Sequence, residues 1–572
     1  MQEKSETGYD RLTGGVLVPL FALRGKSDLG CGDTEALREF VIWAADHGFR
    51  LVQLLPVNET GSDNSPYNAI SSVAIEPATI ELSAVPDLQH AEIEAVAHFY
   101  REGDLRSGPV KWSGVKALKR ELLRRAFVNF CDPSRRGNES RAREFAEFTK
   151  AEAGWLDAYA LFRLLMEIHG TEHWSSWPQE VRSADSARAW VISQTAERRA
   201  DIDRDMRYFK YVQWQAFSQW RAMKADADQR GVLLMGDVPF GVNYHSADVW
   251  AEPELFDLKW SGGAPPEPAF TDDEFIRKWG QNWGVPLYRW PAHRATGFAW
   301  WRRRVRKVGD AFHLFRIDHA LGFFRIYGFP WRPERNAEFL PLTEQEVMER
   351  TGGDVPRFHE FPDDTPEHCE ANRAQGVELL EVLQAEVGPR ALVGEDLGVV
   401  PDYVRPSLQK LGIPGFKVPL WEVEHDLRLI PRDKYERCSI ATFATHDHEP
   451  LCATWEKWMS VVHAALNEPE RLGEQRNFAW REARRLAEWA DFEVPCIMAF
   501  EEVHERLLAA LFCSGSWLAV VMITDLLGTT QRFNIPGSVG DGNWSARLPS
   551  GWETTYAEKA WRVSRLLRSA GR

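Results

Sequence analysis

Short apolar runs recur along the chain, and most are followed by a polar loop and then by apolar residues at helical spacing. The helical pattern at 33–47, for example, places Leu37, Phe40, Val41 and Ala44 on one face and ends at Gly48. Strands that alternate with helices indicate a parallel sheet. The candidate strands are 16–20, 51–55, 232–235, 312–317, 391–393, 416–420, 439–444 and 517–523.

Eight strand–helix units predict the α/β class and a closed (β/α)8 TIM barrel, which needs about 250 residues. Because the chain has 572 residues, the surplus must lie in insertions. The largest surplus falls between the second and third strands and has a mostly helical pattern. We therefore expect the barrel in 1–82 and 211–572 and a helical inserted subdomain in 83–210. A doubly wound open sheet is the alternative fold, but the sequence has no GxGxxG turn to support it.

Composition and charge exclude several classes of partner and location. The formal net charge of −15 argues against a protein that neutralises nucleic-acid phosphates or binds an anionic membrane, so we expect neither as a partner. The opening MQEKSETGYD is polar, and no apolar run reaches about 18 residues, so we expect no signal peptide and no membrane span. The seven cysteines are scattered without zinc-site spacing, which predicts no metal site and a reducing, cytoplasmic location.

Four acidic residues directly follow predicted strands, where the active face of a barrel lies. Like charges that converge there repel one another, which is costly unless the site uses them. A metal site and a solvated acidic rim are the competing interpretations. Paired carboxylates, one to attack and one to donate a proton, are the groups that cleave glycosidic bonds. The four are Asp237 in MGDVPFGV, Asp318 in FRIDHALG, Glu395 in LVGEDLG and Asp447 in FATHDHEP.

Neighbouring residues suggest different roles for two of these carboxylates. Arg316 lies two residues before Asp318, so both side chains point to the same side of the strand, and the guanidinium would hold Asp318 ionised. Burial and the adjacent Asp396 would raise the pKa of Glu395. Periodicity alone does not decide which of Glu395 and Asp396 points inward, although the strand LVGE favours Glu395. His319 fits a hydrogen-bond partner of a catalytic carboxylate better than a sugar contact.

Several long motifs follow one another in order: SDLGCGD, LVQLLPVNETG, SPYNAISS, GDVPFGVNYHSADVW, GQNWGVPLYRW, RIDHALGFFRIYGFPW, GEDLG, THD and RFNIPG…GNW. In this order they resemble glycoside hydrolase family 77, the 4-α-glucanotransferases, over nearly the whole chain. LVQLLPVN and RIDHALGFFRI are most similar to the branch that contains the plant cytosolic disproportionating enzyme. Because the first predicted strand comes almost at once, we expect no counterpart of the carbohydrate-binding modules that some members of that branch carry at the N-terminus.

The resemblance implies a retaining transfer of α-1,4-glucosyl or maltooligosyl units to the 4-hydroxyl of an acceptor sugar, without a cofactor. Maltose, maltooligosaccharides or glycogen- and starch-like α-glucans would be the substrates. Asp318 would be the nucleophile, Glu395 the general acid/base, and Asp447 the carboxylate that stabilises the transition state. The resemblance also implies a lid loop after strand 3, within 251–299, that covers the acceptor side. Further sugar contacts would come from Arg316, His446, Asp237, Ser65, Tyr67 and Asn534, and from Gln281 and Trp283 of the lid.

Two segments depart from the family pattern. His448, Glu449 and Pro450 follow THD, and TDDEFIRKW precedes GQNWG, so the contacts there should differ. A retaining α-glucan hydrolase uses the same carboxylates and is the alternative enzyme. A glucan-binding protein with a dead site would have lost a carboxylate, and this sequence keeps all three. Donor and acceptor length, cyclic products and oligomeric state stay open.

Overall fold

The computed structural model describes residue 9 and residues 11–100, 104–134, 138–266, 273–424, 428–466, 469–536 and 542–572. Residues 1–8 and 10, on which the expectation of no signal peptide rests, lie outside these ranges, as do residues 271 and 272 of TDDEFIRKW. The described strands form a parallel sheet of eight strands and an antiparallel sheet of four. No helix in the described ranges is long and apolar enough to cross a membrane.

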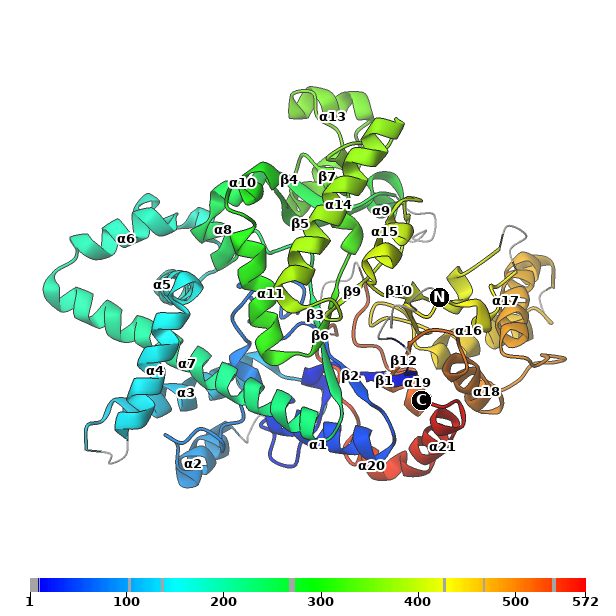
Figure 1. Cartoon of the computed structure of the whole chain (residues 1–572), viewed down its shortest axis with the longest axis horizontal. Coiled ribbons are helices and arrows are strands. Elements are labelled where there is room, and N and C mark those ends of the chain that lie inside the picture. Colours follow the sequence, from blue (N-terminus) through cyan, green and yellow to red (C-terminus); the bar gives the residue numbers. More distant parts are fainter. Residues whose placement is uncertain are drawn as a thin grey trace, which may run out of the picture.

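The parallel sheet confirms the predicted (β/α)8 barrel, and each predicted apolar run overlaps one of its strands, with ends that differ by a few residues (Figure 1). The hydrogen-bonded order is β10-β11-β12-β1-β2-β3-β6-β9. Nearly all strand residues are buried, as expected where side chains fill the barrel and helices cover it. The strands are β1 (Thr13–Leu17), β2 (Leu51–Gln53), β3 (Leu233–Val238), β6 (Leu314–Ile317), β9 (Leu392–Gly394), β10 (Gly415–Lys417), β11 (Ser439–Ala441) and β12 (Leu518–Met522).

The barrel has a seam between β9 and β10, the two ends of the hydrogen-bonded order. Among the described residues, one backbone hydrogen bond crosses this seam, from Gly394 N to Pro414 O at 3.0 Å. The Asp396 side chain adds a second link, because its Oδ1 accepts from Phe416 N at 2.7 Å. Gly415 leaves room for that carboxylate: an added Cβ would lie 2.7 Å from Asp396 Oδ2. The seam is therefore closed partly by a side chain.

Helices pack around the barrel as the apolar periodicity predicts. The first of them, α1 (Thr34–Asp46), begins at Asp33, whose side chain accepts from Ala36 N and so satisfies a free amide of the first turn. Its buried face carries the residues that the 33–47 pattern marks. The other helices that follow barrel strands are α8 (Ala247–Ala251), α11 (Ala299–Ala311), α14 (Pro366–Val387), α15 (Val404–Leu411), α16 (Leu451–Ala464), α17 (Pro469–Trp489), α18 (Phe500–Phe512), α19 (Ile523–Leu527), α20 (Trp552–Thr555) and α21 (Ala557–Ser569).

The segment between β2 and β3 is helical, and Figure 1 shows it along one side of the barrel. Its helices are α2 (His90–Tyr100), α3 (Trp112–Cys131), α4 (Asn138–Ala151), α5 (Ala153–His169), α6 (Ala184–Ser193) and α7 (Ala196–Gln229). Because α7 runs without interruption through residue 210, it joins the insertion to the barrel. The division into a subdomain at 83–210 stays a prediction.

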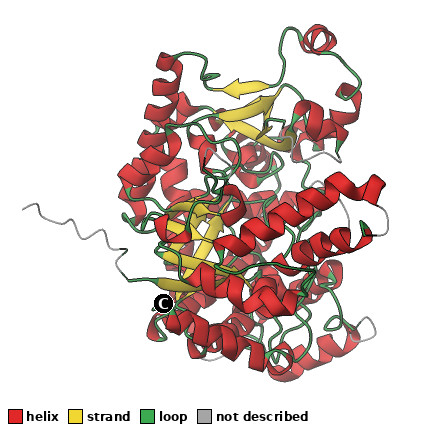
Figure 2. Ribbon diagram, turned by 90° about the vertical axis from the view of Figure 1, so that its right-hand side faces the viewer, coloured by secondary structure: helices red, strands yellow, loops and turns green. Residues whose placement is uncertain are grey.

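The antiparallel sheet, here called the cap sheet, was not predicted from the sequence. Its order is β5-β4-β7-β8, and Figure 2 shows it apart from the barrel strands. Two of its strands lie in 251–299, for which the sequence suggested only a lid loop. The strands are β4 (Phe256–Ala264), β5 (Gln281–Tyr288), β7 (Ile326–Phe329) and β8 (Arg357–His359), accompanied by α9 (Glu274–Trp279), α10 (Trp290–Ala295), α12 (Asn336–Phe339) and α13 (Glu344–Thr351).

The cap sheet has a small apolar core of its own. Trp279, Phe329, Trp331, Phe339 and Val347 form a buried cluster separate from the two larger clusters of the barrel. Trp331 and Phe339 stack with their ring centroids 4.0 Å apart. The lid motif GQNWG therefore belongs to a packed strand, because β5 pairs with β4 along most of its length.

Candidate active site

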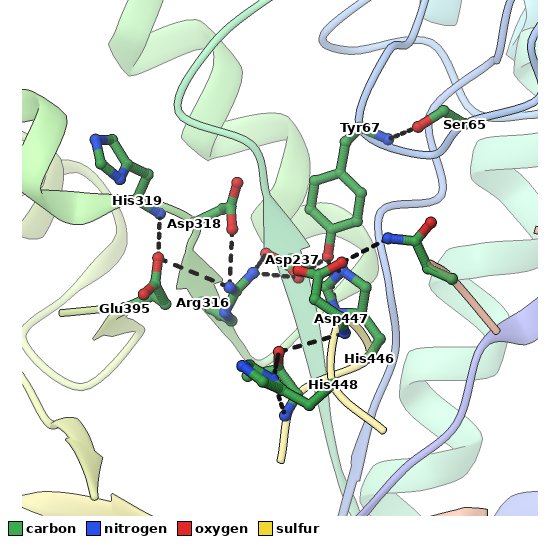
Figure 3. Close-up of polar contacts among 12 residues, drawn as sticks. Ser65, Tyr67, Asp237, Arg316, Asp318, His319, Glu395, His446, Asp447 and His448 are labelled. Carbon is green, nitrogen blue, oxygen red and sulfur yellow. Dashed lines mark hydrogen bonds and ion pairs between the residues drawn. The ribbon is translucent and has the colours of Figure 1, made fainter. Parts of the chain in front are cut away.

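Arg316 is the centre of the site. Strand pairing places it opposite Asp237, and its Nη1 donates to Asp237 Oδ1 at 2.9 Å and Oδ2 at 2.7 Å (Figure 3). Its Nη2 lies 2.8 Å from Asp318 Oδ1 and 3.8 Å from Glu395 Oε2. One buried guanidinium thus joins carboxylates from three neighbouring strands. The predicted shared side of Arg316 and Asp318 agrees with this geometry.

Glu395 is held by backbone amides. Its Oε2 accepts from His319 N at 2.7 Å, and its Oε1 accepts from Leu397 N at 2.8 Å. Burial raises the pKa of Glu395 to about 7, and the charge of Asp318 adds to this, while Arg316 acts in the opposite direction. A carboxyl group with this pKa exchanges its proton near neutral pH, as a general acid/base must. Asp396 faces the seam instead, which settles the choice that the sequence left open.

Asp447 is in a contrasting environment. Its Oδ1 accepts from Asn534 Nδ2 at 2.6 Å, and its Oδ2 lies 3.3 Å from His446 Nε2. Burial acts to raise the pKa of Asp447, but His446 and the hydrogen bond from Asn534 outweigh burial and keep the pKa below its usual value. Arg532 Nη2 also donates to the backbone oxygen of Asp447 at 2.9 Å. Asp447 is therefore a firmly held, ionised carboxylate.

Tyr67 and His446 connect Asp447 to the Arg316 centre. The Tyr67 hydroxyl donates to Asp237 Oδ2 at 2.7 Å and lies 3.4 Å from His446 Nδ1. The two rings stack with centroids 4.9 Å apart and an interplanar angle of 9°. Ser65 supports the turn before this ring, because its Oγ accepts from Tyr67 N at 3.3 Å. The carboxylates and Tyr67 thus form one connected polar network.

The lid residues lie against His319. Trp283 keeps 39% of its surface exposed and donates from Nε1 to Gln281 Oε1 at 3.2 Å. Its ring meets the His319 ring edge-on, with centroids 4.8 Å apart. Burial lowers the pKa of His319 to about 4, so this imidazole is neutral at pH 7. Because the backbone amide of His319 donates to Glu395, the lid contacts a residue that holds the Glu395 carboxyl group.

The structure brings the predicted site residues together, some by direct contact and others through an intervening residue. Asp237, Arg316, Asp318 and Glu395 share direct contacts, and the rest join through Tyr67, Asn534 or the lid. Sequence reasoning missed Arg532 and the two backbone amides on Glu395. Arg532 lies in the RFNIPG motif, two residues from Asn534, so the motif held a signal for it. In the described part of the chain, no three His, Cys, Asp or Glu side chains are grouped to hold a metal ion.

An eight-stranded parallel barrel with paired carboxylates at its strand ends is typical of enzymes that act on glycosidic bonds. Within this class, the chain belongs to glycoside hydrolase family 77: residues 18–553 match the family model described as 4-alpha-glucanotransferase. This confirms the predicted family and the prediction of a 4-α-glucanotransferase over the amylase-like alternative.

Similar proteins agree with the family. A 4-alpha-glucanotransferase from Chlamydia pneumoniae is 29% identical over 551 residues, which cover 93% of this chain and 91% of that protein. One from rice (Oryza sativa subsp. japonica) is 32% identical over 323 residues, which cover 55% of this chain and 32% of the rice protein. The fold matches amylomaltase from Streptococcus agalactiae in complex with acarbose, with a TM-score of 0.73, 22% identity, and coverage of 98% of this chain and 100% of that one.

Proposed function

We propose that this chain moves α-1,4-glucosyl or maltooligosyl units by double displacement, with Asp318 as nucleophile and Glu395 as general acid/base. The observation that carries the proposal is the asymmetry between the two carboxyl groups. Arg316 contacts Asp318 Oδ1 at 2.8 Å but lies 3.8 Å from Glu395, whose buried carboxyl has its pKa raised to about 7. Glu395 is thus the group that can carry a proton near neutral pH, beside a carboxyl group paired with arginine.

In the first step, Asp318 attacks the anomeric carbon of the donor while Glu395 gives its proton to the departing glycosidic oxygen. The bond to the leaving sugar breaks, and an ester bond between Asp318 and the anomeric carbon forms. In the second step, Glu395 takes the proton from the 4-hydroxyl of an acceptor, whose oxygen displaces Asp318. Two inversions give retention, and protons balance without an added cofactor.

Asp447 is proposed to stabilise the transition state between these steps. Asn534 donates to one oxygen of its carboxylate, and His446 lies beside the other. Each oxygen has a second lone pair, so the carboxylate can still bind hydroxyl groups of the distorted sugar. Positive charge develops on the sugar ring in an oxocarbenium-like transition state. A fixed negative charge beside the ring stabilises that state more than the ground state.

Transfer must outcompete water, which is always present. Binding an acceptor sugar next to the glycosyl-enzyme raises the effective concentration of its hydroxyl, and excluding water protects the ester. The partly exposed ring of Trp283, which packs against His319, is suited to lie against a sugar on the acceptor side. Maltose, maltooligosaccharides and glycogen- or starch-like glucans are the proposed substrates, in keeping with the acarbose bound to the streptococcal amylomaltase.

Incubation with maltotriose alone tests the proposal. Transfer should yield glucose together with a ladder of longer maltooligosaccharides, resolved by chromatography, while the total number of reducing ends stays constant. Hydrolysis instead adds a reducing end with each bond cleaved. Products that are only shorter than maltotriose, with a rising count of reducing ends, would show that the chain is a hydrolase.

The pH dependence of cleavage should report Glu395. Because the protonated carboxyl donates the proton in the first step, kcat/KM for maltotriose should fall about tenfold per pH unit above its pKa of about 7. With α-maltosyl fluoride, whose leaving group needs no proton, this alkaline fall should disappear. If kcat/KM falls with the same midpoint pH for both donors, the fall reports a group other than Glu395.

A further inference from the structure

The tip of the lid is fixed by the cap sheet on one side. Asn282, between Gln281 and Trp283, accepts from Ser261 Oγ at 2.6 Å and donates from Nδ2 to Trp331 O and Asn336 Oδ1, both at 3.1 Å. Its amide is therefore occupied within the cap sheet. This fixes one flank of Trp283 but does not connect the lid to the rest of the active-site mouth.

Arg332 supplies the connection on the other side. Its Nη2 donates to the backbone oxygen of Gly284, the residue after Trp283, at 3.0 Å. The guanidinium carbon lies 3.7 Å from the ring centroid of Tyr244, so the planar group stacks on that ring. Glu334 is 3.9 Å away and partly exposed, and a pair of this kind contributes little. Stacking and one hydrogen bond thus hold Arg332.

Tyr244 is itself backed by the helical insertion. Its ring stacks on Trp174 with centroids 5.3 Å apart and an interplanar angle of 13°. Trp174 also donates from Nε1 to the backbone oxygen of Tyr244 at 2.9 Å. Because Trp174 follows α5 in the insertion and Tyr244 follows β3 of the barrel, the sandwich of Trp174, Tyr244 and Arg332 joins three separate parts of the chain at the lid.

We propose that Arg332 is a positioning residue for transfer: by bracing Gly284 against Tyr244 and Trp174, it holds Trp283 over the acceptor side of the site. The proposal rests on the proposed function and extends it. Trp283 reaches the site through His319, whose backbone amide donates to Glu395 at 2.7 Å. Arg332 contacts none of the three catalytic carboxylates among the described residues, so it acts through the lid.

This arrangement separates the two halves of the reaction. Formation of the glycosyl-enzyme depends on Asp318 and Glu395, which Arg316 and backbone amides hold. Capture by an acceptor depends also on a sugar placed within reach of the ester, and a displacement of about 1 Å there costs up to about 100-fold. Loosening the lid should therefore lower acceptor capture and leave ester formation largely unchanged.

The experiment measures both halves in Arg332→Ala. Fluoride release from α-maltosyl fluoride reports ester formation, and the ratio of elongated products to maltose, with maltotriose as acceptor, reports capture. We expect that ratio to fall on the order of tenfold and the KM for maltotriose as acceptor to rise, while the rate constant for ester formation stays within about twofold. Arg332→Lys should show the same loss, because a lysine keeps the charge but not the planar stack.

Matched variants separate bracing from general damage. Tyr244→Ala should reproduce the loss and add little to Arg332→Ala in the double variant, because both remove the same contact. Tyr244→Phe keeps the ring and should leave the ratio unchanged. Arg335→Ala, three residues away on the same segment and bonded to exposed Glu338, should also leave it unchanged.

Two results would overturn the proposal. If the ratio of elongated products to maltose is unchanged in Arg332→Ala and Tyr244→Ala, the contact between Arg332 and Tyr244 does not serve transfer. An equal fall in fluoride release and in capture, with a lowered Tm, would show a purely structural role. If the wild-type protein makes no elongated products from maltotriose, the proposed function fails first, and that outcome is visible before any variant is made.

Discussion

Replacement of Asp318 by Asn should abolish transfer and lower kcat by at least about 10⁴-fold, the scale on which enzymes respond to loss of a nucleophile. The amide is too weak a nucleophile to form the glycosyl-enzyme. It still offers an oxygen to Arg316 Nη2, which now lies 2.8 Å from Asp318 Oδ1. Rates of glucose release from maltotriose, with calorimetry for Tm and glucan affinity, check this expectation.

Chemical rescue sharpens that test. In Asp318→Gly the space of the carboxylate is open to a small anion, so azide with α-maltosyl fluoride should give maltosyl azide of β configuration. Formation of this product requires the missing group to be the one that attacks the anomeric carbon. Substantial turnover by Asp318→Asn, or rescue that yields the α-azide, would contradict the assignment of the nucleophile.

Replacement of Glu395 by Gln should have the second large effect, and that effect should depend on the leaving group. With maltotriose, kcat/KM should fall by about 10³-fold or more, because no proton reaches the departing oxygen. With α-maltosyl fluoride, formation of the glycosyl-enzyme should persist, since fluoride leaves unprotonated. Comparison of the two donors in burst-phase kinetics measures the difference.

Asp396→Asn is the matched control, because it changes the neighbouring carboxyl, which faces the seam. Loss of charge there weakens the link to Phe416 N and the ion pair with Arg405, so a lowered Tm is expected. The ratio of rates with the two donors should stay that of the wild type. If Asp396→Asn shows the leaving-group dependence and Glu395→Gln does not, the acid has been assigned to the wrong residue.

The barrel was predictable because each strand is a short apolar run buried on both faces, bounded by turns and followed by a helix with an apolar face. Strand ends then placed Asp237, Asp318, Glu395 and Asp447 at one mouth. Which of Glu395 and Asp396 points inward was not predictable from periodicity, since it depends on amides of His319 and Leu397 brought in by tertiary folding.

The cap sheet could not be predicted from local sequence patterns. Its strand β4, FDLKWSGGA, holds two glycines and no clean alternation. Its partner β5 is the next strand of the chain, but its other partner, β7, comes only after the barrel strand β6. Pairing across such separations leaves no mark within one segment. The brace on the lid was hidden for the same reason, since Trp174, Tyr244 and Arg332 meet only after three regions have folded.

Because few hydrogen bonds cross the seam between β9 and β10, we expect the barrel to be less rigid there than between its other strands. Glu395 directly follows Gly394, whose amide forms the described backbone bond across that seam, so the proposed proton donor lies next to this weakly bonded part of the rim. A rim with few cross-strand bonds can yield by fractions of an ångström without breaking the ladder between β6 and β9. A cross-link between β9 and β10 should therefore raise Tm. It should also slow the step in which Glu395 transfers a proton, with a smaller effect on substrate affinity.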